Sequence, residues 1–405
     1  MVYSEDYKKL VDATALKDKY YEIDERVEEI CKEAFKGCDK LEEIVMPKKL
    51  KKIDSEAFQG CSSLTKLILP DSVARIDGLA FCGCSGLTEL TLPNSVRLIE
   101  VFAFEGCSGL TKLTLPDSIT SIGDCAFYGC SGLTELTLSN SVTSIGYSAF
   151  RGCSGLTELT LPNSVKSIGD GAFADCSGLE KITVESGNSR YDSRDNCNSI
   201  IDKKTNTLIA GCKNSVIPNS VARIDGLAFC GCSGLTELTL PNSVKSIGDG
   251  AFAYCSGLTE LTLPNSVKSI GRYAFQGCSG LTELTLPNSV KSIGDRAFAY
   301  CSGLTELTLP NSVTSIGNCA FGGCSGLTEL TLPNSITSIG DYAFAYCSDL
   351  SKITSLAEIP PMCGFKVFNG VNKTNCELIV PEGSVAAYTR AEDWNKFSNI
   401  RGFSK

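Results

Sequence analysis

The sequence predicts a solenoid, in which short coils stack on one another and share one continuous hydrophobic core. Three observations lead to this fold class. Thirteen cysteines recur every 23 residues in two series, the segment Ser72–Val96 returns unchanged as Ser220–Val244, and apolar residues keep the same places in each copy. A unit of 23 residues cannot bury its own apolar side, so the copies, about fourteen of them, must stack.

Each unit reads as two short extended segments joined by turns. The copy that begins at Cys324 is CSGLTELTLPNSITSIGDYAFAY, and its L-x-x-L-x-L start alternates as a half-buried strand does. Pro333 and the residues after it turn the chain, and I-T-S-I-G forms a second extended segment. Ala343 and Phe344 pack inward before the next cysteine. These features predict a leucine-rich-repeat solenoid of right-handed stacked coils, with a parallel β-sheet on one face and short strands and turns on the other.

The array is interrupted once and changes at both ends. Between Cys176 and Cys232 the chain is 33 residues longer than one unit, and NSIID, KKTN and TLIAG predict a small β-hairpin there. At the ends, Ser4–Lys19 predicts a polar helix, Leu378–Val380 a last strand, and the residues after Ser384 a helix carrying Ala387, Tyr388 and Trp394. The predicted parts are an N-terminal helical cap (1–19), a first array (20–184), the hairpin insertion (185–213), a second array (214–357) and a C-terminal strand–helix cap (358–405). Capped ends favour a monomer.

Composition excludes several classes of function. The net charge of −9 argues against nucleic-acid binding, which needs basic surface. No histidine is present, which removes the usual general base and zinc ligand. No segment has the roughly 18 consecutive apolar residues of a membrane span. No catalytic motif appears either, and every prominent carboxylate belongs to a repeated position. We therefore expect a non-enzymatic protein without cofactor, metal or membrane insertion.

The 22 cysteines allow either thiols or disulfides. Repeat cysteines in neighbouring coils point side by side, and the apolar ladders are long, so we interpret them as buried, reduced thiols that act as small core residues. Cys197 and Cys212, which flank the hairpin, are the best candidates for a disulfide.

Two rows of residues are candidate binding surfaces. On the outer side of the sheet, glutamates stand in successive coils, at Glu237, Glu260, Glu283, Glu306 and Glu329. They indicate either a track for a divalent cation or a basic partner, or a solvated face left by copying one unit.

The other row lies around G-D-x-A-F-x-x, where the copies differ most. The C-terminal half gathers Tyr254, Tyr273, Tyr300, Tyr342 and Tyr346 there, with Arg272 and Arg296 nearby. Tyrosine and arginine are enriched at interface hot spots, so this strip is a candidate contact surface, as are the Glu/Thr sheet and the hairpin. Scattered surface tyrosines are the alternative interpretation.

The repeat L-x-x-L-x-L-P, V-x-x-I-G, A-F-x-x-C resembles that of the BspA-like leucine-rich-repeat proteins over roughly residues 20–400. The hairpin and the tail VPEGSVAAYTRAEDWNKFSNI are similar to that family as well. The resemblance implies a non-catalytic adhesin-like protein, on the cell surface or secreted, that binds host or microbial proteins or glycans. The N-terminus shows no signal peptide, which leaves a cytoplasmic protein–protein interaction module as the alternative. A spacer without any ligand is a third possibility.

Overall fold

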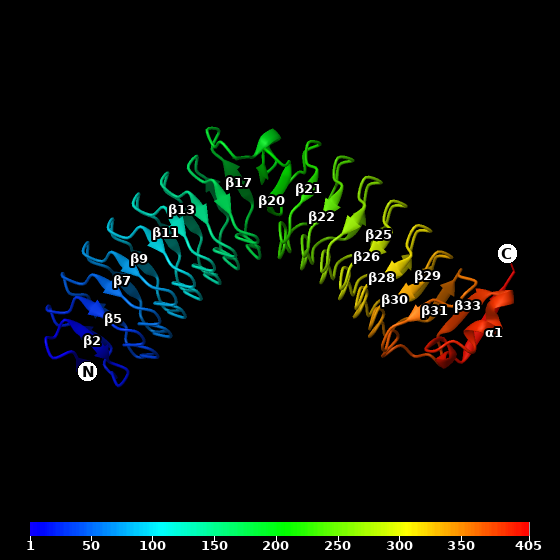
Figure 1. The fold of residues 1–405 in the computed structure, drawn as a ribbon, viewed down its shortest axis with the longest axis horizontal. Helices are drawn as coiled ribbons and strands as arrows, with labels where there is room; N and C mark the ends of the chain where they lie inside the picture. The colour runs from blue at the N-terminus through cyan, green and yellow to red at the C-terminus, as the bar shows by residue number, and fades with distance from the viewer. Residues whose placement is uncertain (405) are drawn as a thin grey trace. The chain divides into compact units, whose positions relative to one another are not determined.

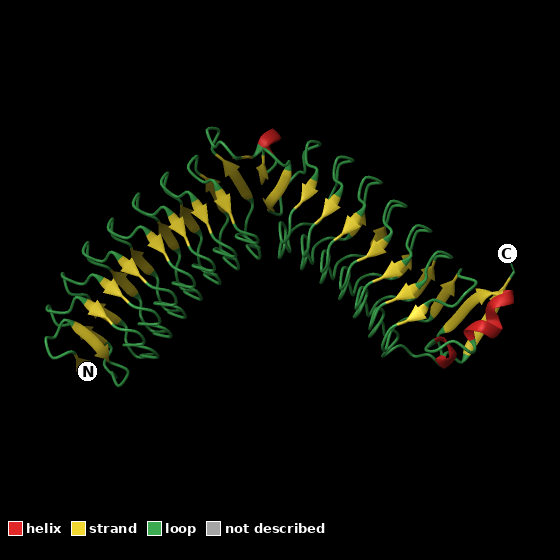
Figure 2. Ribbon diagram, in the orientation of Figure 1, coloured by secondary structure: helices red, strands yellow, loops and turns green. Residues whose placement is uncertain are grey.

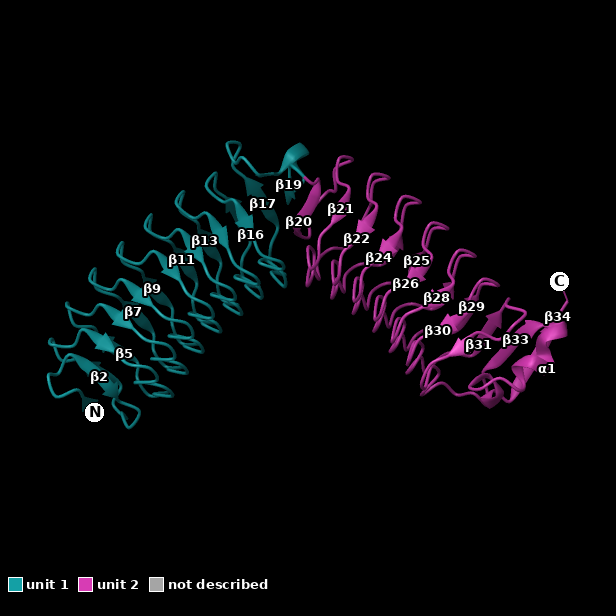
Figure 3. Ribbon diagram, viewed as in Figure 1, with its two compact units in different colours: residues 1–204 teal, residues 205–405 magenta. Residues whose placement is uncertain are grey.

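The computed structural model describes residues 1–404, and the chain forms two compact units, Met1–Lys204 and Thr205–Lys405 (Figure 3). Both units are stacks of coils built from short parallel strands, and together they contain about 17 turns (Figure 1). The predicted solenoid is therefore confirmed. The structure has more turns than 23-residue copies, because the irregular ends also form turns of the stack.

Nearly every regular coil contributes one strand to each of two ladders (Figure 2). The first ladder contains the L-T-E-L-T-L segment, and the outward-pointing side chains of its strands are called the sheet face below. In unit 1 its strands are β3 (Tyr20–Glu22), β5 (Glu43–Val45), β7 (Lys66–Ile68), β9 (Glu89–Thr91), β11 (Lys112–Thr114), β13 (Glu135–Thr137), β15 (Glu158–Leu161) and β17 (Lys181–Val184). In unit 2 they are β23 (Glu260–Thr262), β25 (Glu283–Thr285), β27 (Glu306–Thr308), β29 (Glu329–Leu332), β31 (Lys352–Ser355), β33 (Glu377–Pro381) and β34 (Asn399–Phe403).

The second ladder contains the S-I-G segment, and most of its strands have two residues. In unit 1 they are β2 (Lys9–Asp12), β4 (Glu29–Ile30), β6 (Lys52–Ile53), β8 (Arg75–Ile76), β10 (Leu98–Ile99), β12 (Ser121–Ile122), β14 (Ser144–Ile145) and β16 (Ser167–Ile168). In unit 2 they are β20 (Thr207–Gly211), β21 (Arg223–Ile224), β22 (Ser246–Ile247), β24 (Ser269–Ile270), β26 (Ser292–Ile293), β28 (Ser315–Ile316), β30 (Ser338–Ile339) and β32 (Met362–Cys363). Paired residues of regular coils are 23 apart, as in Lys112↔Glu135 and Ser246↔Ser269, so identical positions lie side by side.

The core is a set of ladders of identical side chains. The phenylalanines of A-F stack face to face, with centroids 4.8 to 5.8 Å apart from Phe35 to Phe173 and 5.0 to 5.9 Å apart from Phe229 to Phe368. Buried leucine, isoleucine and alanine ladders run beside them. Each coil thus buries its apolar side against its neighbours, as the sequence requires.

The predicted N-terminal helix is wrong. Residues 1–19 contain β1 (Val2–Tyr3), which pairs antiparallel with β2, and β2 pairs parallel with β4. Leu10, Ala13 and Leu16 are buried, and Leu10 lies beside Ile30 in the ladder. The N-terminal segment therefore covers the first coil by adding an irregular turn to the stack, which gives the exposed strand edge a hydrogen-bonding partner.

The insertion has strands where the sequence predicts them. β19 (Ser199–Asp202) and β20 lie on either side of the K-K-T-N turn, and the boundary between the two units falls inside that turn. In unit 1, β18 (Tyr191–Asp192) pairs antiparallel with β19, and a short 3-10 helix, η1 (Arg194–Asn196), connects them. In unit 2, β20 pairs parallel with β21 and so begins the second ladder of that unit.

The C-terminal helix is shorter than expected. α1 (Val385–Tyr388) follows the 3-10 helix η2 (Glu382–Ser384), and Trp394 lies in a separate 3-10 helix, η3 (Trp394–Lys396). The Ser384 hydroxyl does not cap α1, because it donates to the carbonyl of Glu358, 2.8 Å away. Tyr388 and Trp394 are fully buried, whereas Ala387 is exposed. β33 is followed by one more parallel strand, β34, so the predicted last strand is not the last.

Candidate functional site

The sheet face of unit 1 carries charges that neutralise one another. At its first outward position lysines are interspersed with glutamates, and neighbouring strands form ion pairs: Lys66–Glu89 at 2.9 Å, Lys112–Glu135 at 2.8 Å and Lys181–Glu158 at 3.5 Å. Opposite charges facing each other across strands are mildly stabilising. This part of the surface therefore offers little net charge to a partner.

The same position in unit 2 is acidic. Glu260 lies beside Glu283 and Glu306 beside Glu329, all four are exposed, and they follow one another at 23-residue steps. Only Glu329 has a cation, Lys352 at 2.9 Å; within residues 1–404, Glu237, Glu260, Glu283 and Glu306 form no ion pair. Like charges about 5 Å apart repel, so this row, called the acidic strip below (Glu237, Glu260, Glu283, Glu306, Glu329), costs some stability.

Glu237 differs from the other members of the strip because its segment is not a strand. It lies in the first coil of unit 2 that carries L-T-E-L-T-L, so within that unit the segment has a ladder neighbour on one side only. A shallow hollow of ≈ 330 Å³ opens on the face at this point, lined by Thr236, Glu237, Leu238, Thr239, Thr259, Glu260 and Thr262. Threonine hydroxyls and the carboxylates of Glu237 and Glu260 thus border this hollow.

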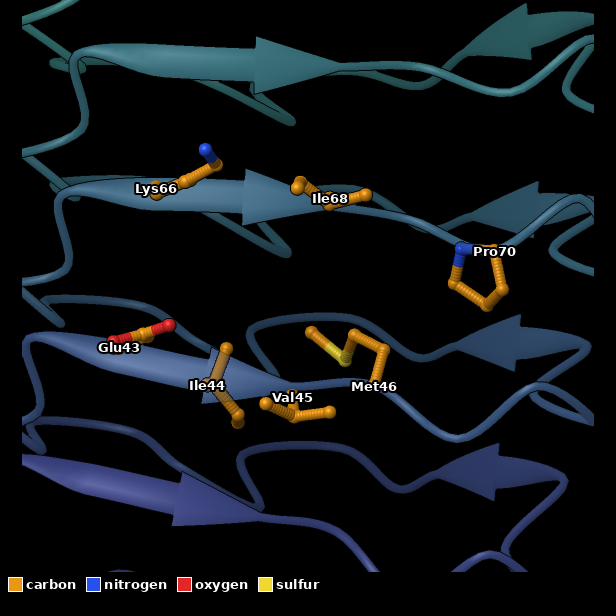
Figure 4. Close-up of a pocket in the computed structure, with 7 residues that line it drawn as sticks. All are labelled: Glu43, Ile44, Val45, Met46, Lys66, Ile68 and Pro70. Atoms are coloured by element: carbon orange, nitrogen blue, oxygen red, sulfur yellow. The ribbon is translucent and has the colours of Figure 1, made fainter.

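Unit 1 has a hollow of a different character, ≈ 400 Å³ in volume, between β5 and β7 (Figure 4). Val45 and Ile68 occupy the outward position that holds threonine in most coils, and Ile68 is 55% exposed. Met46 and Pro70 line one end of this hollow, and Glu43 and Lys66 lie at the other. This apolar patch was not predicted from the sequence, although the break in the threonine row is visible there.

The five predicted tyrosines occupy two different positions of the coil, and both positions have a left-handed backbone. Tyr254, Tyr300 and Tyr346, called the tyrosine column below, each have φ of 60°. Tyr273 and Tyr342, with φ of 58° and 54°, lie at the other position, which is four residues earlier in the coil. Tyr273 thus precedes Gly277 by four residues, and Tyr342 precedes Tyr346 by four. The predicted strip is therefore two rows.

The tyrosine column replaces a row of glycines. At the same position unit 1 has Gly37, Gly60, Gly83, Gly106, Gly129 and Gly152, all with positive φ. Glycine suits this backbone, whereas a residue with a Cβ is strained there by about 1–2 kcal/mol. Tyr254, Tyr300 and Tyr346 are 50%, 59% and 62% exposed, so burial of their rings offsets little of this cost.

Tyr273 and Tyr342 have more local partners and are half-buried. The guanidinium groups of Arg272 and Arg296 lie 5.8 and 5.6 Å from the centre of the Tyr273 ring, at cation–π distance. Tyr342 meets Phe365 edge to face at 5.5 Å. The arginines predicted near the strip therefore contact Tyr273, and Arg296 also interacts electrostatically with Tyr300 of the tyrosine column.

The repeat cysteines lie in the core as free thiols. Nearly all of them donate the S–H to the carbonyl of a phenylalanine in the preceding coil, for example Cys107 to Phe81 at 3.3 Å and Cys301 to Phe275 at 3.3 Å. Burial raises the pKa of Cys130 to about 12 and the pKa of Cys107 well above its usual value. A thiol with such a pKa is a poor nucleophile at neutral pH. Cys197 and Cys212, the predicted candidates for a disulfide, are both reduced, so that prediction is wrong.

Two further features concern metal binding and membrane insertion. Residues 1–404 contain no group of three or more cysteines, aspartates or glutamates placed to hold a metal ion. Over the same residues, none of the helices combines the length and the apolar character needed to cross a membrane.

The fold and its outward-facing rows define a leucine-rich-repeat scaffold, a class of protein that presents regularly spaced side chains along a stack of coils. The family model described as BspA type leucine rich repeat region matches residues 15–130, 80–201, 199–303 and 291–376. The chain therefore belongs to the BspA-type leucine-rich-repeat family. No curated protein sequence matches it.

Solved structures of leucine-rich-repeat proteins are similar to this chain. A leucine rich cell surface protein from Faecalibacterium prausnitzii shares 30% identity over 84% of this chain and 92% of its own, with a TM-score of 0.70. A leucine-rich repeat protein from Bacteroides ovatus shares 28% over 93% of this chain and 88% of its own, with a TM-score of 0.57. The pneumococcal vaccine antigen PcpA, at 21% identity over 98% of this chain and 83% of its own and a TM-score of 0.57, shares the fold.

Proposed function

We propose that the chain is a non-catalytic, adhesin-like scaffold outside the cell, and that the acidic strip of unit 2 binds a basic surface of another protein. The observation that carries this proposal is the contrast between the two sheet faces. In unit 1 lysines are interspersed with glutamates and form ion pairs with them. In unit 2 Glu237, Glu260, Glu283 and Glu306 lie in consecutive coils and form no ion pair among the described residues.

Uncompensated charge on a solvent-exposed ladder favours a partner that supplies the missing cations. A basic protein would relieve repulsion between neighbouring glutamates and would gain electrostatic complementarity on contact. The threonines of the same strands, such as Thr262 and Thr285, are exposed beside the glutamates and offer hydroxyls for hydrogen bonds. The strip is also long and nearly uniform, so a partner with several basic groups would engage several coils at once.

Placement outside the cell is supported by the similar protein from Faecalibacterium prausnitzii, which is described as a leucine rich cell surface protein. One observation favours a second candidate, an intracellular protein–protein interaction module: all 22 cysteines are reduced, as is usual in a reducing compartment. Protease treatment of intact cells that express the protein separates the two, because only a surface protein would be digested.

The binding test uses the purified full-length chain against basic and acidic matrix proteins, glycans and whole cells. A triple variant, Glu260→Gln, Glu283→Gln and Glu306→Gln, removes three unpaired charges. The matched control, Glu89→Gln, Glu135→Gln and Glu158→Gln, removes three paired charges from unit 1. We expect saturable binding to a basic protein that falls at least ~10-fold in the first variant and weakens with added salt, which screens exposed charges.

Equal weakening by both triple variants would show that net charge matters and the strip does not. Binding that neither variant changes would remove the sheet face from the proposal. Absence of binding to every extracellular target would contradict the adhesin-like function.

A further inference from the structure

The tyrosine column has a spacing set by the coil repeat. Tyr254, Tyr300 and Tyr346 are 46 residues apart, so they occupy every second coil, and the coils that follow them have Gly277, Gly323 and Gly370 at the same position. In these coils the buried phenylalanines are spaced 5.2 to 5.5 Å per coil. Two coils therefore separate successive tyrosines by roughly 10 Å, about twice the distance between parallel neighbours.

The glycines between the tyrosines are required by the rings themselves. A methyl group at Gly277 would lie 2.6 Å from Cδ1 of Tyr254, and one at Gly323 would lie 2.6 Å from Cδ1 of Tyr300. Each ring thus rests with one side over the backbone of the next coil, and half or more of its surface stays exposed. Because tyrosine alternates with glycine, the aromatic rings are separated from one another by a coil without a side chain at this position, and they do not stack on each other.

The column holds strain that its own packing does not explain. Three tyrosines keep φ of 60°, where unit 1 uses glycine in almost every coil. Strained residues that persist in a fold are found most often at functional sites. Exposed tyrosines give a large contact area at a small cost in side-chain entropy.

The chain neighbours of the column are uncharged and mostly small or polar, whereas the guanidinium of Arg296 lies close enough to Tyr300 for an electrostatic interaction. Alanine precedes each tyrosine and cysteine and serine follow it, and Gln276, Gly322 and Asn369 precede the three glycines. The amide nitrogen of Gln276 donates to the hydroxyl of Tyr254 at 3.2 Å. Such a surface suits a neutral ligand with many hydroxyl groups and flat apolar faces.

We propose that the tyrosine column binds a neutral, linear β-1,4-linked polysaccharide, with one sugar ring against each tyrosine. In an extended β-1,4-linked chain alternate sugars present the same face, and the length of this two-sugar repeat is close to the separation of successive tyrosines. The apolar face of a pyranose ring packs on an aromatic ring, and three tyrosines in one line engage the same strand together. The proposal deepens the scaffold function proposed above, on which it rests, and places a second ligand on a different row of the same unit.

The test measures depletion of the full-length protein from solution by cellulose and by chitin, two neutral β-1,4-linked polymers that differ in their substituents. Starch and a β-1,3-glucan serve as neutral polymers with other linkages. The triple variant Tyr254→Gly, Tyr300→Gly and Tyr346→Gly restores the residue that unit 1 has at this position, so the fold should be retained. Tyr128→Gly with Tyr147→Gly removes two exposed tyrosines of unit 1 as a control.

We expect saturable binding to cellulose, chitin or both, at least ~10-fold weaker in the triple variant and unchanged in the control. Soluble oligosaccharides long enough to contact all three tyrosines, about five sugars, should bind at least ~10-fold more tightly than the disaccharide. No binding to either β-1,4-linked polymer, equal binding to the other linkages, or no loss in the triple variant would each overturn the proposal. The glutamine variants of the acidic strip should bind these polymers normally, which separates failure of this proposal from failure of the protein-binding function.

Discussion

At the scale of single residues, the coil has two positions with a left-handed backbone, and the differences between copies concentrate there. One position has glycine throughout most of unit 1 and tyrosine in alternate coils of unit 2. The other changes in almost every coil, from Glu56 and Leu79 in unit 1 to Arg296 and Cys319 in unit 2. Both positions lie on turns outside the ladders, and most side chains there are at least partly exposed, so most substitutions there change the surface.

The left-handed backbone predicts an unusual order of stability for substitutions of Tyr300. We expect Tyr300→Gly to be more stable than Tyr300→Ala by about 1 kcal/mol, because a Cβ is strained at this φ and the flexibility of unfolded glycine offsets only part of that strain. The measurement is the midpoint of urea unfolding of the two variants.

Tyr128 provides the control, since it is an exposed turn residue whose φ is not positive. There the order should reverse, and alanine should be the more stable substitution. The same order at both positions would contradict the role given to the backbone.

The sequence was sufficient to identify these tyrosines as variable surface residues but not to divide them into two rows. Their positions in the repeat are visible, yet the sign of φ depends on how the turn is closed. A signal was present: the tyrosine column shares its register with Gly37 and Gly60, and glycine in a repeated turn often marks a left-handed residue. The hydrogen bonds from thiols to phenylalanine carbonyls depend on side-chain directions in three dimensions, and the repeat alone does not reveal them.

At the scale of structural elements, the phenylalanine ladder joins each coil to the next. The ring of Phe127 is fully buried between Phe104 and Phe150, with both centroids 5.4 Å away. Phe127→Ala should therefore lower the free energy of unfolding by about 3–5 kcal/mol, because it removes buried area and leaves a cavity on both sides. Hydrogen exchange of the amides of unit 1 measures this loss, and Tyr128→Ala, on the exposed side of the same coil, should cost less than about 1 kcal/mol. A cost for Phe127→Ala as small as that of the control would mean that the coils relax around the gap.

The charge pattern of the sheet face predicts that a glutamate-to-lysine substitution changes the free energy of unfolding in opposite directions in the two units. Glu283→Lys would place a cation between Glu260 and Glu306 and should raise the free energy of unfolding by about 0.2–1 kcal/mol, because it replaces repulsion by attraction across strands. Glu89→Lys would instead place a cation between Lys66 and Lys112, two residues that already carry positive charge. This second substitution should lower stability by a similar amount, because it replaces attraction by repulsion.

Thermal unfolding at low and high salt measures both changes. The two shifts should shrink together as salt screens the charges. Shifts of equal sign would contradict the pairing seen in the structure.

The regular elements were predictable because each is specified about fourteen times over, whereas the ends are specified once. The polar segment before Lys19 looks like a helix in isolation, but the exposed edge of the first coil offers strand partners that a helix would leave unused. Similarly, the tail forms β34 because the edge of β33 is available beside it. At the N-terminus, tertiary pairing of strands thus outweighed the local preference for a helix.

At the scale of the whole molecule, the acidic strip and the tyrosine column both lie in unit 2. Unit 1 has the neutralised sheet face and the row of glycines, and unit 2 has the acidic strip and the tyrosine column. The two units share the same kind of core, so unit 2 departs from unit 1 at solvent-exposed positions. Both proposed ligands would therefore bind to unit 2. Substitutions in unit 1 serve as controls in both binding experiments.

The buried thiols predict that the protein loses stability in alkali. Burial raises the pKa of Cys130, Cys176 and Cys278 to about 12, whereas an unfolded thiol titrates near about pH 8.5. The stabilisation is fully present below about pH 8.5, and it is lost between that pH and the folded pKa because only the unfolded chain releases the protons. Each such cysteine should contribute a slope of about 1.4 kcal/mol per pH unit in this window.

Urea midpoints measured from about pH 7 to about pH 11 in the presence of reductant test this prediction. Cys153→Ala should make the fall with pH shallower by the share of one thiol, since Cys153 is fully buried and burial raises its pKa well above the usual value. A stability that stays constant over the whole range would contradict the burial of protonated thiols.

The alternation of tyrosine and glycine also restricts how such a chain can lengthen. Duplicating one coil of 23 residues would place two tyrosines, or two glycines, in succession, and the two tyrosine rings would meet at about 5 Å. Duplicating two coils adds one more tyrosine at the established interval and leaves all the others in phase. Duplication within the gene can therefore extend the tyrosine column regularly only in steps of 46 residues. The gain or loss of a single coil would be recognisable because it interrupts the alternation of tyrosine and glycine.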